Sequence, residues 1–183
     1  MKTYKKNFDL LKKNNVYSED MEHDACGVGL IASTEGKKSR NVVEYGIEAL
    51  KAVWHRGAVD ADGKTGDGAG IHVEIPKDFF IEKIEVTGHT HDNSEICVGM
   101  IFLPRNDYAA QESCKTIVES ELTKNDFNIY GWRQVPVNPK VLGEKAFQTM
   151  PEIIQVLFKP HNKELTNKDL ERKIYETRRK IEN

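Results

Sequence analysis

Runs and alternations of apolar residues along the chain predict a mixture of strands and helices. Five apolar segments bounded by polar, glycine or proline residues have the length of strands. They lie at residues 26–33, 70–75, 95–104, 128–137 and 151–160. Helical spacing occurs at 41–55, 107–124 and 166–183, a short turn or helix at 76–80, and a polar surface loop is expected at 83–94. The order of these elements predicts an α/β unit with a mixed or antiparallel sheet.

Capping residues and apolar stripes support the first two predicted helices. Asn41 is a candidate N-cap. Behind it, apolar residues recur at helical spacing at Val43, Ile47, Leu50 and Trp54. In the helix predicted at 107–124, the inward residues are expected to be Ala110, Cys114, Ile117 and Leu122.

The last predicted helix begins with a pair, Thr166 and Asp169, that resembles a capping box. Its apolar stripe is formed by Leu170, Ile174, Thr177 and Ile181. The helix reaches Asn183 without a C-cap signal. We therefore expect the polypeptide to continue beyond this residue.

Composition narrows the class of protein. The chain has 183 residues, of which 38% are hydrophobic and 31% charged, as in ordinary folded globular proteins. This length suits one domain with a substantial core. A net charge of -2, with no strongly basic face, argues against nucleic acid as a partner. No apolar stretch reaches the roughly 18 residues that a membrane span needs.

The first 25 residues differ in character from the rest of the chain. Five lysines lie between residues 2 and 13, and four acidic residues between residues 19 and 24. The segment lacks both a core pattern and the apolar h-region of a signal peptide, so we expect a leader outside the fold. Without a secretion signal, the expected location is the cytoplasm, with reduced cysteines.

The three cysteines, at positions 26, 97 and 114, contain no C-x-x-C pair and predict neither a zinc site nor an iron–sulfur cluster. Cys97 and Cys114 fall on a predicted strand and a predicted helix, where buried thiols are common. No metal site is predicted, and His89 and His91, which flank Thr90 in a polar loop, lack a third ligand.

Cys26 is the candidate nucleophile. It opens a predicted strand in which Gly27 and Gly29 allow close approach of a backbone or a ligand. Cleavage between Ala25 and Cys26 would free an α-amine that could take the proton from the thiol of the same residue. The alternative is a buried, inert thiol.

The glycine-rich stretch TGDGAG, at 65–70, lacks the Lys-Ser/Thr ending of a phosphate-binding P-loop. A tight turn entering a strand is the structural interpretation, with positive φ or close packing at Gly66, Gly68 and Gly70. Just before it, His55 and Arg56 either compensate the end of a helix or form a wall of the site near Cys26. Tyr130 and Trp132 are expected in the core or at a sheet edge.

Four motifs in a fixed order carry a resemblance to a known family. They are CGVGLIA from residue 26, GIEALKAVWHRGAVDADGKTGDGAGIHVEIP from residue 46, FLP from residue 102 and YGWRQVPV from residue 130. Together they resemble the class II glutamine amidotransferase domain at the start of the large chain of bacterial glutamate synthases. The resemblance runs in register from Cys26 to the last residue.

This resemblance implies an α+β fold of the N-terminal nucleophile hydrolase type, a four-layer αββα sandwich that is incomplete here at its C-terminal end. Residues 1–25 would be a propeptide removed on maturation, and residues 26–183 the N-terminal part of the amidotransferase domain. Cys26 would be the catalytic residue, attacking the carboxamide of glutamine, releasing ammonia and leaving a thioester that water hydrolyses to glutamate. Arg56 would bind the substrate.

The family's chemistry extends beyond this segment. Its ammonia travels through a tunnel to a synthase site, where it meets 2-oxoglutarate and flavin reduces the imino product to glutamate. The resemblance implies no cofactor in this segment and FMN and an iron–sulfur cluster in the full-length enzyme. Implied partners are glutamine, the remaining synthase domains of the same chain, and a small electron-supplying subunit or ferredoxin, with no nucleic acid and no membrane.

Two family motifs have no counterpart in the chain. One holds the glutamine-gripping arginine (H-Q-R-x-S-T-N type), and the other holds the oxyanion-hole Asn-Gly (H-N-G-E-I-N type). Loss of one oxyanion donor lowers rates by ~10²–10³, so residues 1–183 alone are expected to be inactive or nearly so. The alternatives are another class II amidotransferase, against which TGDGAGI and YGWRQVP argue, and a non-catalytic α/β binding module.

Overall fold

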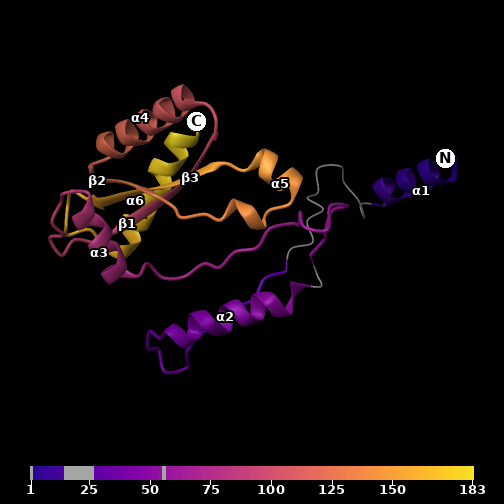
Figure 1. Ribbon diagram of the computed structural model, residues 1–183, viewed down its shortest axis with the longest axis horizontal. Coiled ribbons are helices and arrows are strands. Elements are labelled where there is room, and N and C mark those ends of the chain that lie inside the picture. The colour runs from indigo at the N-terminus through magenta and orange to yellow at the C-terminus, as the bar shows by residue number, and fades with distance from the viewer. Residues whose placement is uncertain (1, 15–26, 55–56) are drawn as a thin grey trace. The chain divides into compact units, whose positions relative to one another are not determined.

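The computed structural model describes residues 2–14, 27–54 and 57–183 (Figure 1). Contacts within the chain define two compact units. The first comprises Met1–Ala58 and Gly68–Ile71, and the second comprises Val59–Asp67 and His72–Asn183. Helices α1 (Lys2–Lys13) and α2 (Arg40–Ala52) belong to the first unit, and the sheet belongs to the second. Among the described residues, no helix is both long and apolar enough to cross a membrane.

Helix α1 lies within residues 1–25, where the sequence pattern predicted no element. Its residues include several good helix formers, such as lysine and leucine. Lys12 and Lys13 occupy the last turn, where positive charge compensates the helix dipole. A segment without a hydrophobic-core pattern therefore still forms a helix.

Helix α2 is confirmed, but its N-cap is Ser39 and not Asn41. The Ser39 backbone is extended, and its hydroxyl accepts a hydrogen bond from the Asn41 amide at 3.2 Å. Asn41 already lies inside the helix, so it cannot cap it. The apolar stripe of α2 is not covered within the described chain, since none of its residues is buried and Trp54, just beyond it, is 73% exposed.

Two predicted strands are not strands in the structure. Residues 27–33 and 70–75 have no ladder partner among the described residues, and the first residue of the earlier prediction, Cys26, lies outside them. The apolar residues of the first segment are not buried either, since Val28 is 95% and Leu30 89% exposed. An apolar pattern favours extended backbone, but a strand also needs a neighbour to pair with.

The other three predicted strands form one antiparallel sheet. They are β1 (Cys97–Leu103), β2 (Phe127–Gln134) and β3 (Glu152–Pro160), in the order β1-β3-β2. Cys97 pairs with Phe158, and Ile129 pairs with the same residue from the other side. The long apolar run of β3 suits this position, because helices pack on both faces of the sheet beside it.

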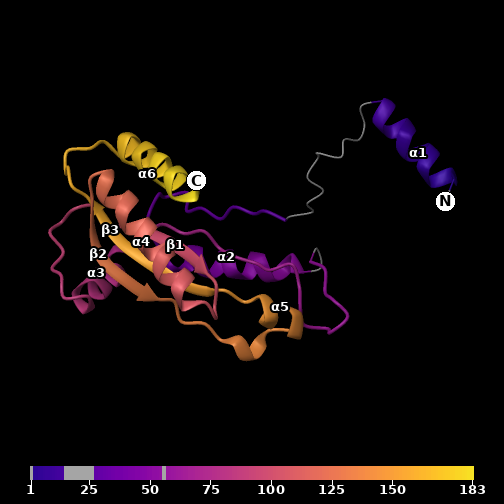
Figure 2. The ribbon, with the colours of Figure 1, turned by 90° about the horizontal axis from the view of Figure 1, so that it is seen from above.

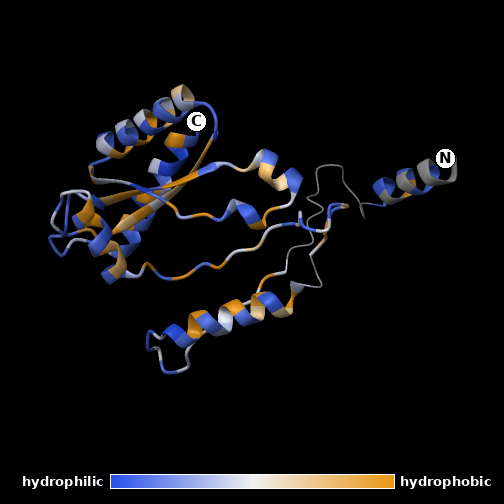
Figure 3. Ribbon diagram, in the orientation of Figure 1, coloured by the Kyte–Doolittle hydropathy of each residue, from blue (hydrophilic) through white to orange (hydrophobic). Residues whose placement is uncertain are grey.

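Helices cover the two faces of the sheet unequally (Figures 1 and 2). Helices α4 (Tyr108–Lys124) and α6 (Asn167–Glu182) pack on one face, around Val156 and Phe158. Helix α3 (Lys77–Val86) packs on the other, against Leu157. On this second face the β1 side chains of Met100 and Phe102 remain 49% and 64% exposed. Figure 3 shows the hydrophobic residues concentrated along the strands.

The capping predictions for the last helix are confirmed. The Thr166 hydroxyl accepts a hydrogen bond from the Asp169 amide at 3.2 Å. Leu170 and Thr177 are buried, with Ile174 and Ile181 packed beside them. Helix α4 begins at the expected place, where the Asp107 carboxylate accepts a hydrogen bond from the Ala110 amide at 2.9 Å.

Two details of the helix predictions are wrong. In α4, Ile117 is 49% exposed, and Val118 takes the inward position at 4%. Helix α3 continues to Val86, into the predicted loop, because Phe80 and Ile84 lie one turn apart and are both buried. The pattern also missed the 3₁₀ turn Pro139–Val141 and the short helix α5 (Glu144–Thr149).

Strand β2 contains a bulge between Ile129 and Gly131. Gly131 has a φ of 145°, and a Cβ there would lie 3.0 Å from Cγ2 of Thr87. Glycine is required here for two reasons: it adopts the positive φ, and it leaves room for the chain after α3, which approaches closely. This explains the glycine of the YGWRQVPV motif in structural terms.

Asp92 ties the loop after α3 to the end of the sheet. Its carboxylate accepts hydrogen bonds from Lys159 at 2.8 Å and from the Ser94 hydroxyl at 2.6 Å, and forms an ion pair with Lys163 at 2.8 Å. The Tyr130 hydroxyl donates a longer bond of 3.4 Å. The hydrogen bonds from Lys159, Lys163 and Ser94 hold the pKa of Asp92 well below its usual range.

We predict that Asp92→Asn reduces the sensitivity of the fold to acid. Because the pKa of Asp92 is lowered on folding, its contribution is fully present above the unfolded-state pKa near ~4 and declines as pH falls below it. The free energy of unfolding of the wild type should therefore decrease between about pH 4 and pH 2 more steeply than that of the variant. Urea unfolding across this range measures the difference. Glu85→Gln, at an exposed position of α3, is the matched control, and equal slopes for wild type and Asp92→Asn would contradict the prediction.

Candidate functional site

The two residues predicted to act on substrate, Cys26 and Arg56, lie outside the described residues. The nearest described chain after Arg56 begins at Gly57, whose amide donates a hydrogen bond to the Trp54 carbonyl at 3.0 Å. The following residues, 59–67, belong to the second unit. They form the loop that contains the DADGKTGD part of the glycine-rich motif.

This loop, residues 59–67, folds back on itself. Val59 and Gly66 form an antiparallel bridge, and the Asp60 amide donates a hydrogen bond to the Thr65 carbonyl at 2.8 Å. At the tip, Gly63 has a φ of 68° and donates its amide hydrogen to the Asp60 carbonyl at 2.9 Å. A tight turn is present, but it lies before the TGDGAG stretch where it was predicted, and no strand follows that stretch among the described residues.

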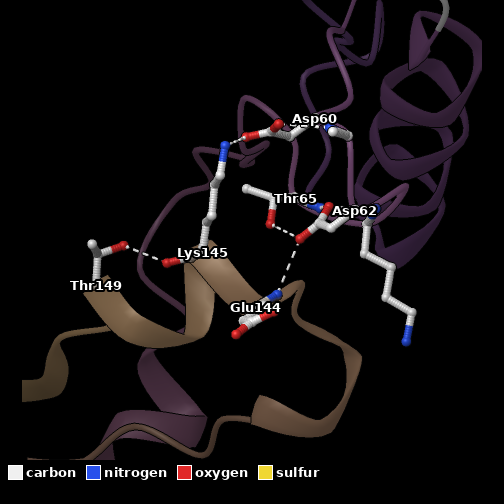
Figure 4. Close-up of polar contacts among 8 residues, drawn as sticks. Asp60, Asp62, Thr65, Glu144, Lys145 and Thr149 are labelled. Atoms are coloured by element: carbon white, nitrogen blue, oxygen red, sulfur yellow. Dashed lines mark hydrogen bonds and ion pairs between the residues drawn. The ribbon is translucent and has the colours of Figure 1, made fainter.

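The Asp62 carboxylate is the centre of the loop's polar contacts (Figure 4). Its Oδ1 accepts hydrogen bonds from the amides of Lys64 at 2.9 Å and Thr65 at 2.7 Å. Its Oδ2 accepts from the Thr65 hydroxyl at 2.6 Å and from the Glu144 amide at 3.0 Å. These bonds, with the Thr65 hydroxyl first among them, hold the pKa of Asp62 far below its usual range.

The bond to Glu144 joins residues 82 positions apart. Glu144 is the first residue of α5, and the N-cap residue, Gly143, has no side chain to satisfy the free amides of the helix. Asp62 supplies the missing acceptor from the loop. We call the contacts of Asp62 with Lys64, Thr65 and Glu144 the Asp62 clamp.

Gly143 is the steric counterpart of the Asp62 clamp. A Cβ at this position would lie 2.5 Å from the Thr65 amide nitrogen, and closer still to the side-chain oxygens of Thr65 and Asp62. Gly143 is buried although the loop around it is exposed. Its φ of -71° is open to any residue, so close approach and not backbone angle requires glycine here.

A second contact, between Lys145 and Asp60, lies beside the clamp. The Lys145 ammonium is 2.5 Å from Asp60 Oδ2, and its side chain is 66% exposed. Ion pairs exposed to this degree stabilise proteins weakly, by about 0–1 kcal/mol. Asp62 is exposed as well, and only its bond to the Glu144 amide reaches α5, so the close packing at the buried Gly143 is the main evidence for the attachment of the loop to α5.

The described side chains of the YGWRQVPV motif pack in the core of the sheet or form hydrogen bonds beside it. Tyr130 is 3% exposed, as expected for a core residue, and burial together with the nearby Asp92 raises its pKa to about 12. Trp132 packs against the core and donates a hydrogen bond to Glu119 at 2.6 Å. Arg133 donates to Gln155 on β3 at 2.6 Å, and its guanidinium lies over the Phe79 ring.

Cys97 is a poor nucleophile and metal ligand. Cys97 is 5% exposed, and its burial, with Glu95 and Glu171 nearby, raises its pKa to about 12. Cys114 is half-buried on α4. Within the described part of the chain, no three His, Cys, Asp or Glu residues are grouped so as to hold a metal ion. His89 instead contacts the Thr87 hydroxyl at 3.1 Å.

The sequence pattern did not reveal the Asp62 clamp. It attributed the glycine requirement to Gly66, Gly68 and Gly70; the structure gives Gly68 a φ of 73°, whereas the close packing falls on Gly143. The D-x-K-T order at 62–65 is a local signal for a side chain that accepts from the following amides. Nothing in the sequence linked it to α5.

Comparison of the sequence with known proteins identifies the family of this chain. The family of class-II glutamine amidotransferases matches residues 26–183, and the chain belongs to it. The resemblance drawn from the sequence motifs is thereby confirmed. The match begins at Cys26, the predicted nucleophile.

The relatives found are glutamate synthases. The chain is 52% identical over 179 residues to the glutamate synthase (NADPH) large chain of Azospirillum brasilense, covering 98% of this chain and 12% of that protein. It is 41% identical over 162 residues to the chloroplastic/mitochondrial ferredoxin-dependent glutamate synthase 1 of Arabidopsis thaliana, covering 88% of this chain and 10% of the relative. The chain thus spans about a tenth of the length of these proteins.

We predict that Gly143→Ala detaches the loop 59–67 from α5. The added methyl cannot be accommodated without moving Thr65 or Asp62, so the Asp62–Glu144 bond should break. Hydrogen exchange of the Thr65 and Glu144 amides should accelerate by about tenfold or more, as expected for loss of ~1.5 kcal/mol of local protection. Gly46→Ala on α2, where a Cβ meets nothing within 4 Å, is the matched control. Unchanged exchange in Gly143→Ala would show that the clamp is not a close contact.

Proposed function

We propose that the chain is the glutaminase part of a glutamate synthase large chain, with Cys26 as its nucleophile. The observation that carries the proposal is the family match, which starts at Cys26 and continues to the last residue. The 52% identity to a glutamate synthase large chain supports this choice among class II amidotransferases. The ordered motifs from CGVGLIA to YGWRQVPV agree with it.

In the proposed reaction, cleavage between Ala25 and Cys26 frees the α-amine of Cys26. This amine takes the thiol proton, and the thiolate attacks the carbonyl carbon of the glutamine carboxamide. The C–N bond breaks, the nitrogen leaves as ammonia with the proton returned by the α-amine, and a thioester remains. Water then hydrolyses the thioester to glutamate and restores the thiol. Residues 1–25, including α1, are in this proposal the propeptide whose removal creates the base.

The domain is proposed to be a four-layer αββα sandwich. In support, α4 and α6 cover one face of the sheet, while the face toward α3 leaves Met100 and Phe102 exposed for a second sheet.

The complete enzyme is proposed to pass the ammonia to its other domains, where 2-oxoglutarate is converted to glutamate. FMN and an iron–sulfur cluster are expected in those domains. The described cysteines do not form the ligand set of an iron–sulfur cluster, since Cys97 is buried in the core and Cys114 is on a different element. The relatives include NADPH and ferredoxin forms, so a small electron-supplying subunit or ferredoxin is the expected partner. The expected location is the cytoplasm.

We predict that Cys26→Ala in the full-length enzyme lowers glutaminase activity by on the order of 10⁴-fold or more, because the reaction loses its nucleophile. A glutamine-like electrophile should label the wild type at Cys26 alone, since burial makes the Cys97 thiol unreactive. Mass spectrometry of the labelled peptides gives the result. Cys114→Ala is the matched control and should retain activity. Equal labelling of all three thiols, or a mature chain that still begins at Met1, would favour a binding module.

For Arg56→Ala we predict a rise in the KM for glutamine of about tenfold or more, as expected when a charge-assisted hydrogen bond to substrate is lost. Initial rates of ammonia release in the full-length enzyme measure it. Arg40→Ala, which removes an exposed arginine at the start of α2, is the control. An unchanged KM in Arg56→Ala would remove Arg56 from the substrate pocket.

A further inference from the structure

An open pocket lies at one end of the sheet, where β1 and β3 separate. The last residue of β1, Leu103, pairs with Glu152, the first residue of β3. Beyond this pair, residues 102–106 lead out of β1, and residues 148–151 lead from α5 into β3. Together they line a pocket of about 440 Å³, a volume within the range of small-molecule sites. All of these residues belong to the second unit.

Arg105 is the charged residue among the described residues that line this pocket. Its guanidinium carbon lies over the Phe147 ring of α5, 4.5 Å from the ring centroid. A cation–π contact uses no hydrogen-bond acceptor, so it leaves the N–H donors of the guanidinium unpaired. The buried Gln111 amide fixes the backbone beneath it, donating to the carbonyls of Pro104 at 2.7 Å and Arg105 at 3.2 Å.

Among the residues that the structure describes, the Arg105 guanidinium has no ionic or hydrogen-bonding partner. The other described arginines all form an ion pair or a hydrogen bond with a side chain: Arg40, Arg133, Arg172, Arg178 and Arg179. The carboxylate closest to Arg105 along the chain, that of Asp107, accepts from the Ala110 amide at 2.9 Å and caps α4. A guanidinium that is held in place without a counterion is suited to bind an anion from outside.

The remaining lining of the pocket limits which anion fits. Its walls include the half-buried apolar side chains of Met150 and Pro151. The side-chain amides of Asn106 and Gln148 form no hydrogen bond with other described residues. A single cation beside apolar walls matches a single carboxylate on an apolar chain, whereas the second negative charge of a dicarboxylate or a phosphate would have no partner.

We propose that this pocket binds a small monocarboxylate, whose carboxylate pairs with the Arg105 guanidinium and whose apolar chain lies against Met150 and Pro151. The planar guanidinium can donate two parallel N–H bonds to a carboxylate. One such pair, with partial burial of a short chain, corresponds to a Kd on the order of 1 mM. None of these residues takes part in the proposed glutaminase reaction.

The experiment uses the full-length protein and phenylglyoxal, a reagent that modifies unprotected guanidinium groups. Arg105 should react, and about 10 mM hexanoate should slow its modification about tenfold, as mass action gives for a ligand at ten times its Kd. Hexanamide, which has a similar shape but no charge, should leave the rate unchanged. Mass spectrometry of the modified peptides measures the rates. Arg172, exposed and paired with Asp169, is the internal control that hexanoate should not protect.

A variant of the ring beneath Arg105 tests the geometry. Phe147→Leu should reduce the protection by hexanoate to about threefold or less, because the guanidinium is no longer held in place before the ligand binds. Phe147 is 45% exposed, so the fold should tolerate the change. Tyr175→Leu is the matched control: it removes the ring that lies 5.5 Å from the Arg178 guanidinium on α6 and should keep the tenfold protection.

Four results would overturn the proposal. An unchanged rate with hexanoate would show that the pocket does not bind it. Equal protection by hexanamide, or equal protection of Arg172, would show that the charge of Arg105 is not what is recognised. Stronger protection by glutarate would exclude a site for monocarboxylates. An Arg105 that does not react even without hexanoate would show that another part of the full-length protein occupies the pocket.

Discussion

The central strand β3 is the constraint on which the second unit depends. It pairs with β1 on one side and β2 on the other, and residues from both of its faces enter the two hydrophobic clusters of this unit. Adjacent residues such as Val156 and Leu157, at 2% and 0% exposure, point to opposite layers. Packing of α3, α4 and α6 is therefore organised by a single nine-residue segment. The position of α5 and of the loop it holds follows from the chain that leads into this strand.

The sequence was sufficient to predict those elements whose position is determined by residues next to one another in the chain. Asp107 and Thr166 mark helix starts because a cap needs only the amides that follow it. The apolar run at 151–160 predicted a strand, but its central position in the sheet was seen only in the structure. Ser39 and Asn41 were harder to separate, since both can cap and only the backbone angles decide.

Features that depend on partners far along the chain could not be predicted in this way. Gly143 is required by a carboxylate 81 positions earlier, at Asp62, and no spacing rule connects the two. The segments 27–33 and 70–75 were predicted as strands because pattern shows what a segment favours and not whether a neighbour is there to pair with it. The residues of the candidate site also fall into those found from local sequence signals and those found from contacts between distant residues. Cys26 and Arg56 came from motif and chemistry, whereas the Asp62 clamp came from contacts in the structure.

The order β1-β3-β2 has a consequence for handling the protein. In the described sheet both β1 and β2 are edge strands, and an edge presents free amides and carbonyls to any other extended chain. On β1 this edge runs beside the exposed side chains of Met100 and Phe102. At high concentration, this edge offers a template for edge-to-edge association of two copies of the chain. Self-association through β1 is therefore the outcome to guard against when residues 1–183 are produced at high concentration.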